Sequence, residues 1–122
     1  NKRKTMRKII YGIKNLIKWF PIIWKDRDWD YYYIMEIYKK KLLFTAKHMR
    51  KNGYHENSPK YAEQIENCAA WMHMVQNEVL LDAVIQSKNA SEDDLNKAIA
   101  EHDELRKKLF TTMEENIESW WN

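Results

Sequence analysis

The sequence predicts an all-α fold: a four-helix, bundle-like domain in which a short basic N-terminal helix precedes three longer antiparallel helices. Only two glycines and two prolines interrupt the 122 residues, and long windows between them consist of residues that favour helices. Apolar residues within these windows recur every three or four positions, the period of one helical face. The turns between windows are short, and short turns place neighbouring helices antiparallel. We therefore expect one helical domain over residues 1–122.

The first helix is expected at about residues 4–20, where the apolar positions follow helical spacing. They are Met6, Ile9, Ile10, Ile13, Leu16, Ile17 and Phe20. Pro21 is expected to end this helix, because proline lacks an N–H donor and disfavours a helical conformation in the residue before it.

The second helix is expected at about residues 30–52, with Asp30 as its N-cap. Gly53 is expected to supply a left-handed residue at its C-terminal end. Its inward face is predicted to comprise Tyr31, Ile34, Met35, Tyr38, Leu42, Thr45, Ala46 and Met49.

Two further helices are expected at about residues 59–86 and 92–120. Ser58 before Pro59 is a typical helix start, and Ser91 with Asp94 is related to a capping box. The inward face of the third helix is predicted to be Ala62, Ile65, Cys68, Ala69, Met72, Val75, Val79 and Ala83. That of the fourth is Leu95, Ala98, Ile99, His102, Leu105, Leu109, Met113, Ile117 and Trp120.

Composition and charge restrict the setting of the protein. A single cysteine, Cys68, excludes an internal disulfide and fits a reducing cytosol. No apolar run is long enough to span a bilayer, so we expect a cytoplasmic, soluble or surface-associated protein without a transmembrane segment. Residues 1–60 contain 16 Lys/Arg and 5 Asp/Glu, whereas residues 61–122 contain 5 and 13, so the two halves carry net charges of +11 and −8.

The stretch KDRDWDYYY, residues 25–33, places Asp26, Asp28 and Asp30 at every second position, as in a calcium-binding EF-hand loop. Such a loop also needs a glycine at its sixth position and a glutamate at its twelfth, and here these are Tyr31 and Ile37. The pattern therefore predicts no metal site. A catalytic carboxylate pair would need burial that a sequence does not show, so helix capping and charge pairing are the preferred interpretation.

The aromatic residues around this stretch are candidates for binding. Three consecutive tyrosines on a helix point in directions about 100° apart, so they cannot all enter one core. Tyrosine, tryptophan and arginine are enriched at interfaces and at stacking sites for bases. The predicted interface or stacking residues are Trp24, Arg27, Trp29, Tyr31, Tyr32 and Tyr33.

A second candidate site lies at the turn between the second and third helices. Basic residues beside a helix N-terminus favour phosphate and other anions, although basic residues at a helix C-terminus also simply oppose the helix dipole. The candidate anion site comprises Lys47, His48, Arg50, Lys51, His55, Ser58 and Lys60.

The basic N-terminal helix has two interpretations. Seven basic residues precede Trp19, and the first acidic residue is Asp26. Such a segment suits nucleic-acid phosphates or an anionic membrane surface. Its apolar stripe equally suits a helix that covers the core of its own bundle.

The pattern formed by eleven residues resembles a recurring type of small helical protein encoded by tailed bacteriophages. These residues are Trp24, Asp28, Trp29, Asp30, Tyr31, Tyr33, Lys41, Leu42, Gly53, His55 and Ser58. The resemblance implies a viral protein in the cytosol of a host cell, without implying an activity. Small non-enzymatic phage proteins often inhibit a host defence or regulatory protein, or sequester its nucleotide signal.

We therefore predict a protein without catalytic activity or cofactor that binds and inhibits a host protein. The alternatives are a nucleotide-binding sponge and a basic helix that binds nucleic acid or a membrane surface. We also expect a homo-oligomer, because apolar residues lie on more than one face of the long helices and because the opposite charges of the two halves allow complementary pairing. These additional apolar residues are Leu43, Phe44, Leu80, Leu81, Ile85, Phe110 and Trp121.

Overall fold

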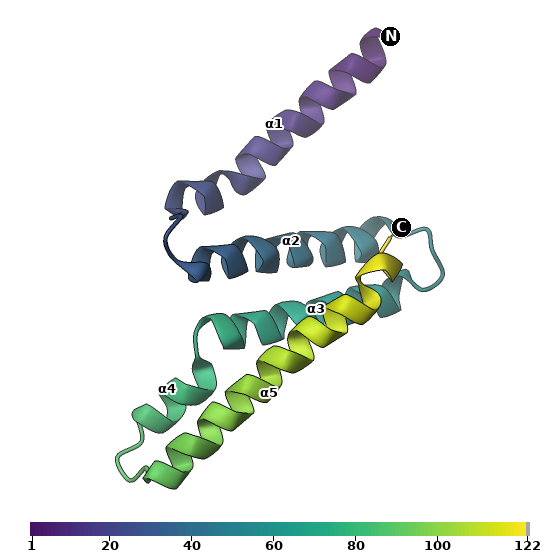
Figure 1. Ribbon diagram of the computed structural model, residues 1–122. Helices are drawn as coiled ribbons and strands as arrows, with labels where there is room; N and C mark the ends of the chain where they lie inside the picture. The colour runs from purple at the N-terminus through teal and green to yellow at the C-terminus, as the bar shows by residue number, and fades with distance from the viewer. Residues whose placement is uncertain (122) are drawn as a thin grey trace. The chain divides into compact units, whose positions relative to one another are not determined.

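The computed structural model describes residues 1–121, and all of its regular secondary structure in this range is helical (Figure 1). It confirms the all-α class. The chain divides into two compact units, Asn1–Tyr33 and the part that begins at Ile34, where the sequence predicts one helical domain.

Unit 1 contains helix α1, Lys2–Lys25, and the first residues of α2. The Asn1 side chain caps α1 by accepting a hydrogen bond from the Arg3 N–H at 3.0 Å. The predicted end at Pro21 is wrong, because α1 continues through this proline to Lys25. Proline removes the hydrogen bond to the carbonyl four residues earlier, that of Ile17. Ile17 is 71% exposed, so water can hydrate that carbonyl and the helix continues.

Helix α2 spans Tyr31–Asn52. The predicted cap is confirmed: the Tyr32 N–H donates to Asp30 Oδ1 at 3.0 Å. The predicted inward face is partly wrong, because Tyr31, Ile34 and Tyr38 are 57%, 59% and 52% exposed. Met35, Leu42, Ala46 and Met49 are buried as predicted, and Lys39, which was not predicted, is buried with them. The five buried positions lie alternately four and three residues apart.

The predicted third helix is two helices, α3 at Ser58–Gln76 and α4 at Val79–Ile85. Residues 1–121 therefore form five α-helices and not four. The break lies at Glu78, whose φ of 49° is left-handed, and no glycine or proline marks it in the sequence. The Asn77 side chain stabilises the end of α3 by donating to the His73 carbonyl at 2.9 Å.

Helix α5 spans Glu92–Asn116 and is followed by a short 3-10 helix, η1, at Ile117–Ser119. The structure confirms a capping box. The Asp94 N–H donates to Ser91 Oγ at 3.2 Å, and the Ser91 N–H donates to Asp94 Oδ2 at 3.0 Å. Of the residues predicted to face inward, Leu95, Ile99 and Ile117 are exposed, and Ala98 and Leu109 are buried.

The core of unit 2 is built by α2, α3 and α5. Helix α5 lies along α3 and α4 (Figure 1). The buried core residues are Met35, Leu42, Ala46, Met49, Ala62, Ile65, Cys68, Ala69, Met72, Val75 and Leu109. Burial raises the pKa of the Cys68 thiol, which makes it a packing group and not a reactive one. None of the helices in residues 1–121 has the length and apolar content needed to cross a membrane.

Candidate functional site

The predicted aromatic residues all lie in unit 1, around the link between α1 and α2. Trp24 and Trp29 are 73% and 82% exposed. Trp24 stacks on Phe20, with ring centroids 5.7 Å apart, and Tyr32 meets Tyr33 edge to face at 5.2 Å. These contacts are local, so the link presents two large indole rings to solvent.

Two charged residues of the same link, Asp30 and Arg27, form hydrogen bonds with backbone groups of the link and of α2. Asp30 caps α2, and Arg27 Nη1 donates to the Asp26 carbonyl at 2.6 Å. Within residues 1–121, no three His, Cys, Asp or Glu side chains are placed to hold a metal ion. These contacts agree with the capping role predicted for Asp30.

Several residues of the predicted anion site, at the turn between α2 and α3, are engaged in contacts with other residues of the protein. Arg50 Nε lies 3.0 Å from both carboxylate oxygens of Glu66, and these hydrogen bonds lower the pKa of Glu66. His55 packs against Tyr61 and Trp121, with ring centroids 5.7 and 5.2 Å away, and its Nδ1 accepts the Asn57 N–H at 3.1 Å. The remaining basic side chains, Lys47, His48, Lys51 and Lys60, are exposed.

Ser58 and Gly53 form the packed centre of this turn. Ser58 is 1% exposed, and it does not make the predicted side-chain cap, because the N-cap of α3 is Asn57. Gly53 does not have the predicted left-handed conformation. A Cβ atom there would lie 2.3 Å from the Met49 carbonyl oxygen and 2.6 Å from Ser58 Cβ. Glycine is needed here for close approach, and Ser58 is not placed to contact a ligand.

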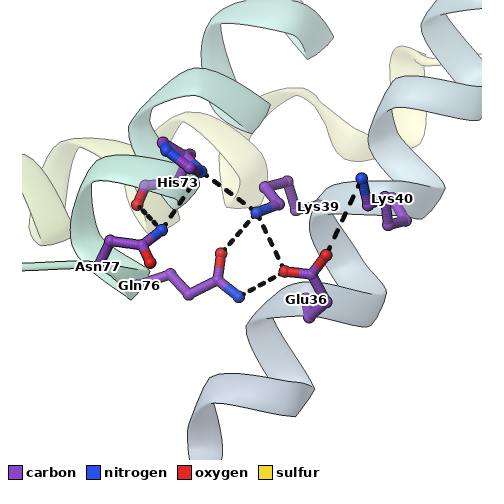
Figure 2. A network of polar contacts seen from close by, with 6 residues as sticks. All are labelled: Glu36, Lys39, Lys40, His73, Gln76 and Asn77. Carbon is purple, nitrogen blue, oxygen red and sulfur yellow. Dashed lines mark hydrogen bonds and ion pairs between the residues drawn. The ribbon is translucent and has the colours of Figure 1, made fainter. Parts of the chain in front are cut away.

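A polar network that the sequence analysis missed joins α2 to α3 (Figure 2). The Lys39 ammonium is central: Nζ lies 2.7 Å from Gln76 Oε1, 3.0 Å from Glu36 Oε2 and 3.2 Å from His73 Nδ1. Gln76 Nε2 also donates to Glu36 Oε2 at 2.7 Å, and Lys40 Nζ lies 3.9 Å from Glu36 Oε1. Lys39 and Gln76 are only 8% and 4% exposed.

The polar groups of the network bind one another. An ammonium group has three donors, and the three contacts of Lys39 use all of them. Burial acts to raise the pKa of Glu36, but hydrogen bonds from Gln76 and Lys39 and the charges of Lys39 and Lys40 outweigh it, so the pKa is lowered. Glu36 therefore stays ionised as the partner of Lys39. The arrangement fixes how α2 packs on α3 and leaves no donor of Lys39 for a substrate.

One signal in the sequence could have identified Lys39. Met35, Leu42, Ala46 and Met49 leave a gap of seven residues in an otherwise regular repeat, and Lys39 fills it. The predicted inward face does not include Lys39, and a lysine is rarely buried unless it is paired. Its partners His73 and Gln76 lie more than thirty positions away, so the sequence does not show the pairing.

Helix α1 has the largest apolar surface of unit 1. None of its residues is buried. One face, the α1 apolar face, consists of Met6, Ile9, Ile10, Ile13, Leu16, Ile17, Phe20, Ile23 and Trp24, which are 46% to 73% exposed. The helix contains eight Lys/Arg and no Asp/Glu. At 3.6 residues per turn, most of these basic residues fall on the opposite side.

The hollows of unit 2 include one of about 410 Å³ between α4 and α5, which has Asp94, Lys97 and Glu101 on its border. Another, of about 510 Å³, lies between α2 and the end of α5. We call it the α2–α5 groove, and it is lined by Tyr38, Lys41, Leu42, Phe110, Met113, Glu114 and Ile117.

No protein family, curated protein or solved structure matches the chain. Its function therefore has to be argued from the surfaces and contacts described above.

Proposed function

We propose that the protein acts by binding, and that helix α1 attaches it to an anionic membrane surface. The observation that supports this proposal is α1 itself: a helix from Lys2 to Lys25 with an exposed apolar face, eight basic residues and no buried residue. Interfacial helices that lie in the plane of a membrane have this combination of features.

Both faces of α1 gain free energy at such a surface. Burying one large apolar side chain stabilises by roughly 1.5–3 kcal/mol, and the α1 apolar face offers nine exposed ones. Each lysine or arginine near anionic headgroups contributes about 1 kcal/mol more. An isolated helix is only marginally stable in water, so some of this free energy is used to order α1.

Nucleic acid accounts for only one face of α1, and a protein partner would need two matching features at once. Nucleic-acid phosphates would bind the basic residues but would leave the α1 apolar face in water. A protein groove would cover the apolar face, but it would need a surrounding acidic rim to match eight positive charges. A membrane with anionic lipids offers both chemistries at once, and the exposed Trp24 suits its interfacial region.

The inhibitor of a host protein, expected from the resemblance to phage proteins, stays a prediction. The nucleotide sponge has less support, because Arg50 is paired with Glu66, His55 is packed between rings and Ser58 is buried. Calorimetric titration with linear and cyclic nucleotides tests the sponge, and the proposal of membrane attachment predicts no heat of binding.

Flotation of the full chain with vesicles tests the proposed function. We expect the protein to float with phosphatidylcholine vesicles that contain phosphatidylglycerol, and to float much less with phosphatidylcholine alone. Raising the salt concentration should weaken binding, because exposed charges are screened. If the protein stays with neither vesicle at low salt, the proposal is wrong.

A matched pair of variants tests the role of the α1 apolar face. Ile17→Asp places a charge in this face, whereas Asn15→Asp adds the same charge on the opposite side of α1. We expect Ile17→Asp to reduce vesicle binding at least about tenfold and Asn15→Asp to reduce it only slightly. Equal losses would mean that charge alone mediates attachment.

A further inference from the structure

The α2–α5 groove is an apolar surface that membrane attachment does not use. It lies entirely in unit 2 and has a volume of about 510 Å³. Three of the side chains that line it are also well exposed: Tyr38 at 52%, Phe110 at 44% and Ile117 at 52%. Continuous exposed apolar surface of this kind marks interaction sites.

The α2–α5 groove carries one positive and one negative side chain, and this pair of charges restricts the kind of partner that fits it. Lys41 stands on the α2 wall and Glu114 on the α5 wall. Within residues 1–121, neither the Lys41 ammonium nor the Glu114 carboxylate belongs to an ion pair. A ligand with a single charge would be attracted to one wall and repelled by the other, so the groove fits a partner that offers both signs.

We propose that this partner is a second copy of the chain, paired through the α2–α5 groove about a two-fold axis. A two-fold axis that runs parallel to the groove places the α2 wall of one copy opposite the α5 wall of the other. Lys41 of each copy then faces Glu114 of the other, which gives two equivalent ion pairs. The half-exposed Tyr38, Phe110 and Ile117 supply the apolar centre of the interface.

The contacts of Lys39 position the α2 wall of the α2–α5 groove. Its contacts with Gln76 and His73 fix the rotation of α2 on α3. Tyr38 and Lys41, which flank Lys39 in the sequence, line the groove on the other side of α2. Because the wall of the groove is positioned before association, pairing requires little further ordering of α2.

Sedimentation velocity of the full chain over a range of concentrations tests the proposal. It should be done with Ile17→Asp in all proteins, so that the α1 apolar face does not cause association of its own. We expect a reversible monomer–dimer equilibrium. A protein that stays monomeric up to the highest attainable concentration would overturn the proposal.

Charge exchange gives the specific test. Lys41→Glu and Glu114→Lys each place like charges opposite one another at two symmetric positions, so each should weaken the dimer about tenfold or more. The double variant Lys41→Glu/Glu114→Lys restores both pairs with reversed signs, and dimerisation should recover to within about threefold of the parent. All of these side chains are exposed, so folding should be preserved, and circular dichroism checks this.

The control variants are Glu115→Lys and Lys47→Glu, exposed residues that do not line the groove. They should leave the dimer unchanged. If they weaken it as much as Glu114→Lys and Lys41→Glu do, or if the double variant fails to recover, the groove is not the interface and the proposal is wrong. All proteins in this experiment carry Ile17→Asp, which weakens the proposed membrane attachment. The result for dimerisation is therefore independent of the result for vesicle binding.

Discussion

Helix α1 of unit 1 and the helices of unit 2 use the same kind of apolar pattern with opposite results. In α1 the apolar positions repeat regularly, yet no residue is buried. In α3 a comparable repeat, from Ala62 to Val75, is buried almost completely. Apolar periodicity therefore shows which side of a helix avoids water, but it does not show what covers that side.

The difference also separates two sources of stability. Within unit 1, helix α1 is supported by its own hydrogen bonds and by the cap by Asn1, which alone give a marginal helix. Unit 2 is stabilised by packing around Ile65, Met72 and Leu109, which are fully buried. Changes to side chains should therefore affect stability strongly in unit 2 and weakly in α1.

The largest expected effect compares Leu109→Ala with Leu16→Ala. Leu109 is 0% exposed, so its truncation removes apolar contacts and leaves a cavity, and it should destabilise unit 2 by about 3 kcal/mol. Leu16 is 70% exposed, so the same change there should alter stability by less than about 0.5 kcal/mol. Urea denaturation followed by near-ultraviolet circular dichroism measures both. Similar losses would show that α1 has a core of its own.

The two glycines provide the next comparison. A methyl group at Gly53 meets the Met49 carbonyl at 2.3 Å, so Gly53→Ala should destabilise unit 2 by about 2 kcal/mol. Nothing lies within 4 Å of the position at Gly12, so Gly12→Ala should stabilise α1 by up to about 1 kcal/mol. Thermal denaturation measures the first change and far-ultraviolet circular dichroism the second. A stabilising Gly53→Ala would contradict the close approach at the turn.

The polar network gives a third contrast, between two adjacent lysines. Lys39→Met keeps the side-chain length but removes the ammonium that donates to Gln76 Oε1 and pairs with Glu36, and it should cost about 1.5 kcal/mol. Lys40→Met removes one long, partly exposed ion pair with Glu36 and should cost less than about 0.5 kcal/mol. Equal costs in urea denaturation would mean that the network adds nothing to stability.

The smallest expected effect is a dependence on pH. The pKa of Glu36 lies below its ordinary value of 4.5 in the folded protein, so its contribution is complete above that pH and is lost as the pH falls through the lowered value. The difference in stability between wild type and Glu36→Gln should be about 1 kcal/mol at neutral pH and should shrink below about pH 4.5. Glu104→Gln, at an exposed position, should show no such convergence.

The sequence predicts local features well and long-range ones poorly. The Asp30 cap, the Ser91–Asp94 capping box and the apolar buried residues of α3 from Ala62 to Val75 depend on neighbouring residues, and all were predicted. Val79 and Ala83, predicted for the same inward face, are instead exposed in α4. The pairing of Lys39 with His73 and Gln76 depends on the packing of distant segments, so it was missed. The left-handed Glu78 gives no local signal, since neither a glycine nor a proline stands at the break, and the packing of α4 on α5 that accompanies the break involves residues distant in the sequence.

The candidate sites divide in the same way. The exposed aromatic residues around Trp24 and Trp29 could be predicted, since helical geometry prevents their joint burial. The anion site could not be assessed from the sequence, because the pairing of Arg50 with Glu66 and the burial of Ser58 depend on tertiary contacts. The continuation of α1 through Pro21 also required the structure, because only the exposure of Ile17 shows that water can replace the missing donor.

Amide hydrogen exchange of the full chain, with and without anionic vesicles, tests the central claim most directly. A helix such as α1 is marginal by itself and should exchange quickly in solution, whereas α3 should be strongly protected. Anionic vesicles should protect the amides of α1 and leave those of α3 unchanged. Strong protection of α1 without vesicles, or no gain in protection with them, would contradict the claim that α1 is a helix that needs a membrane surface to cover its apolar face.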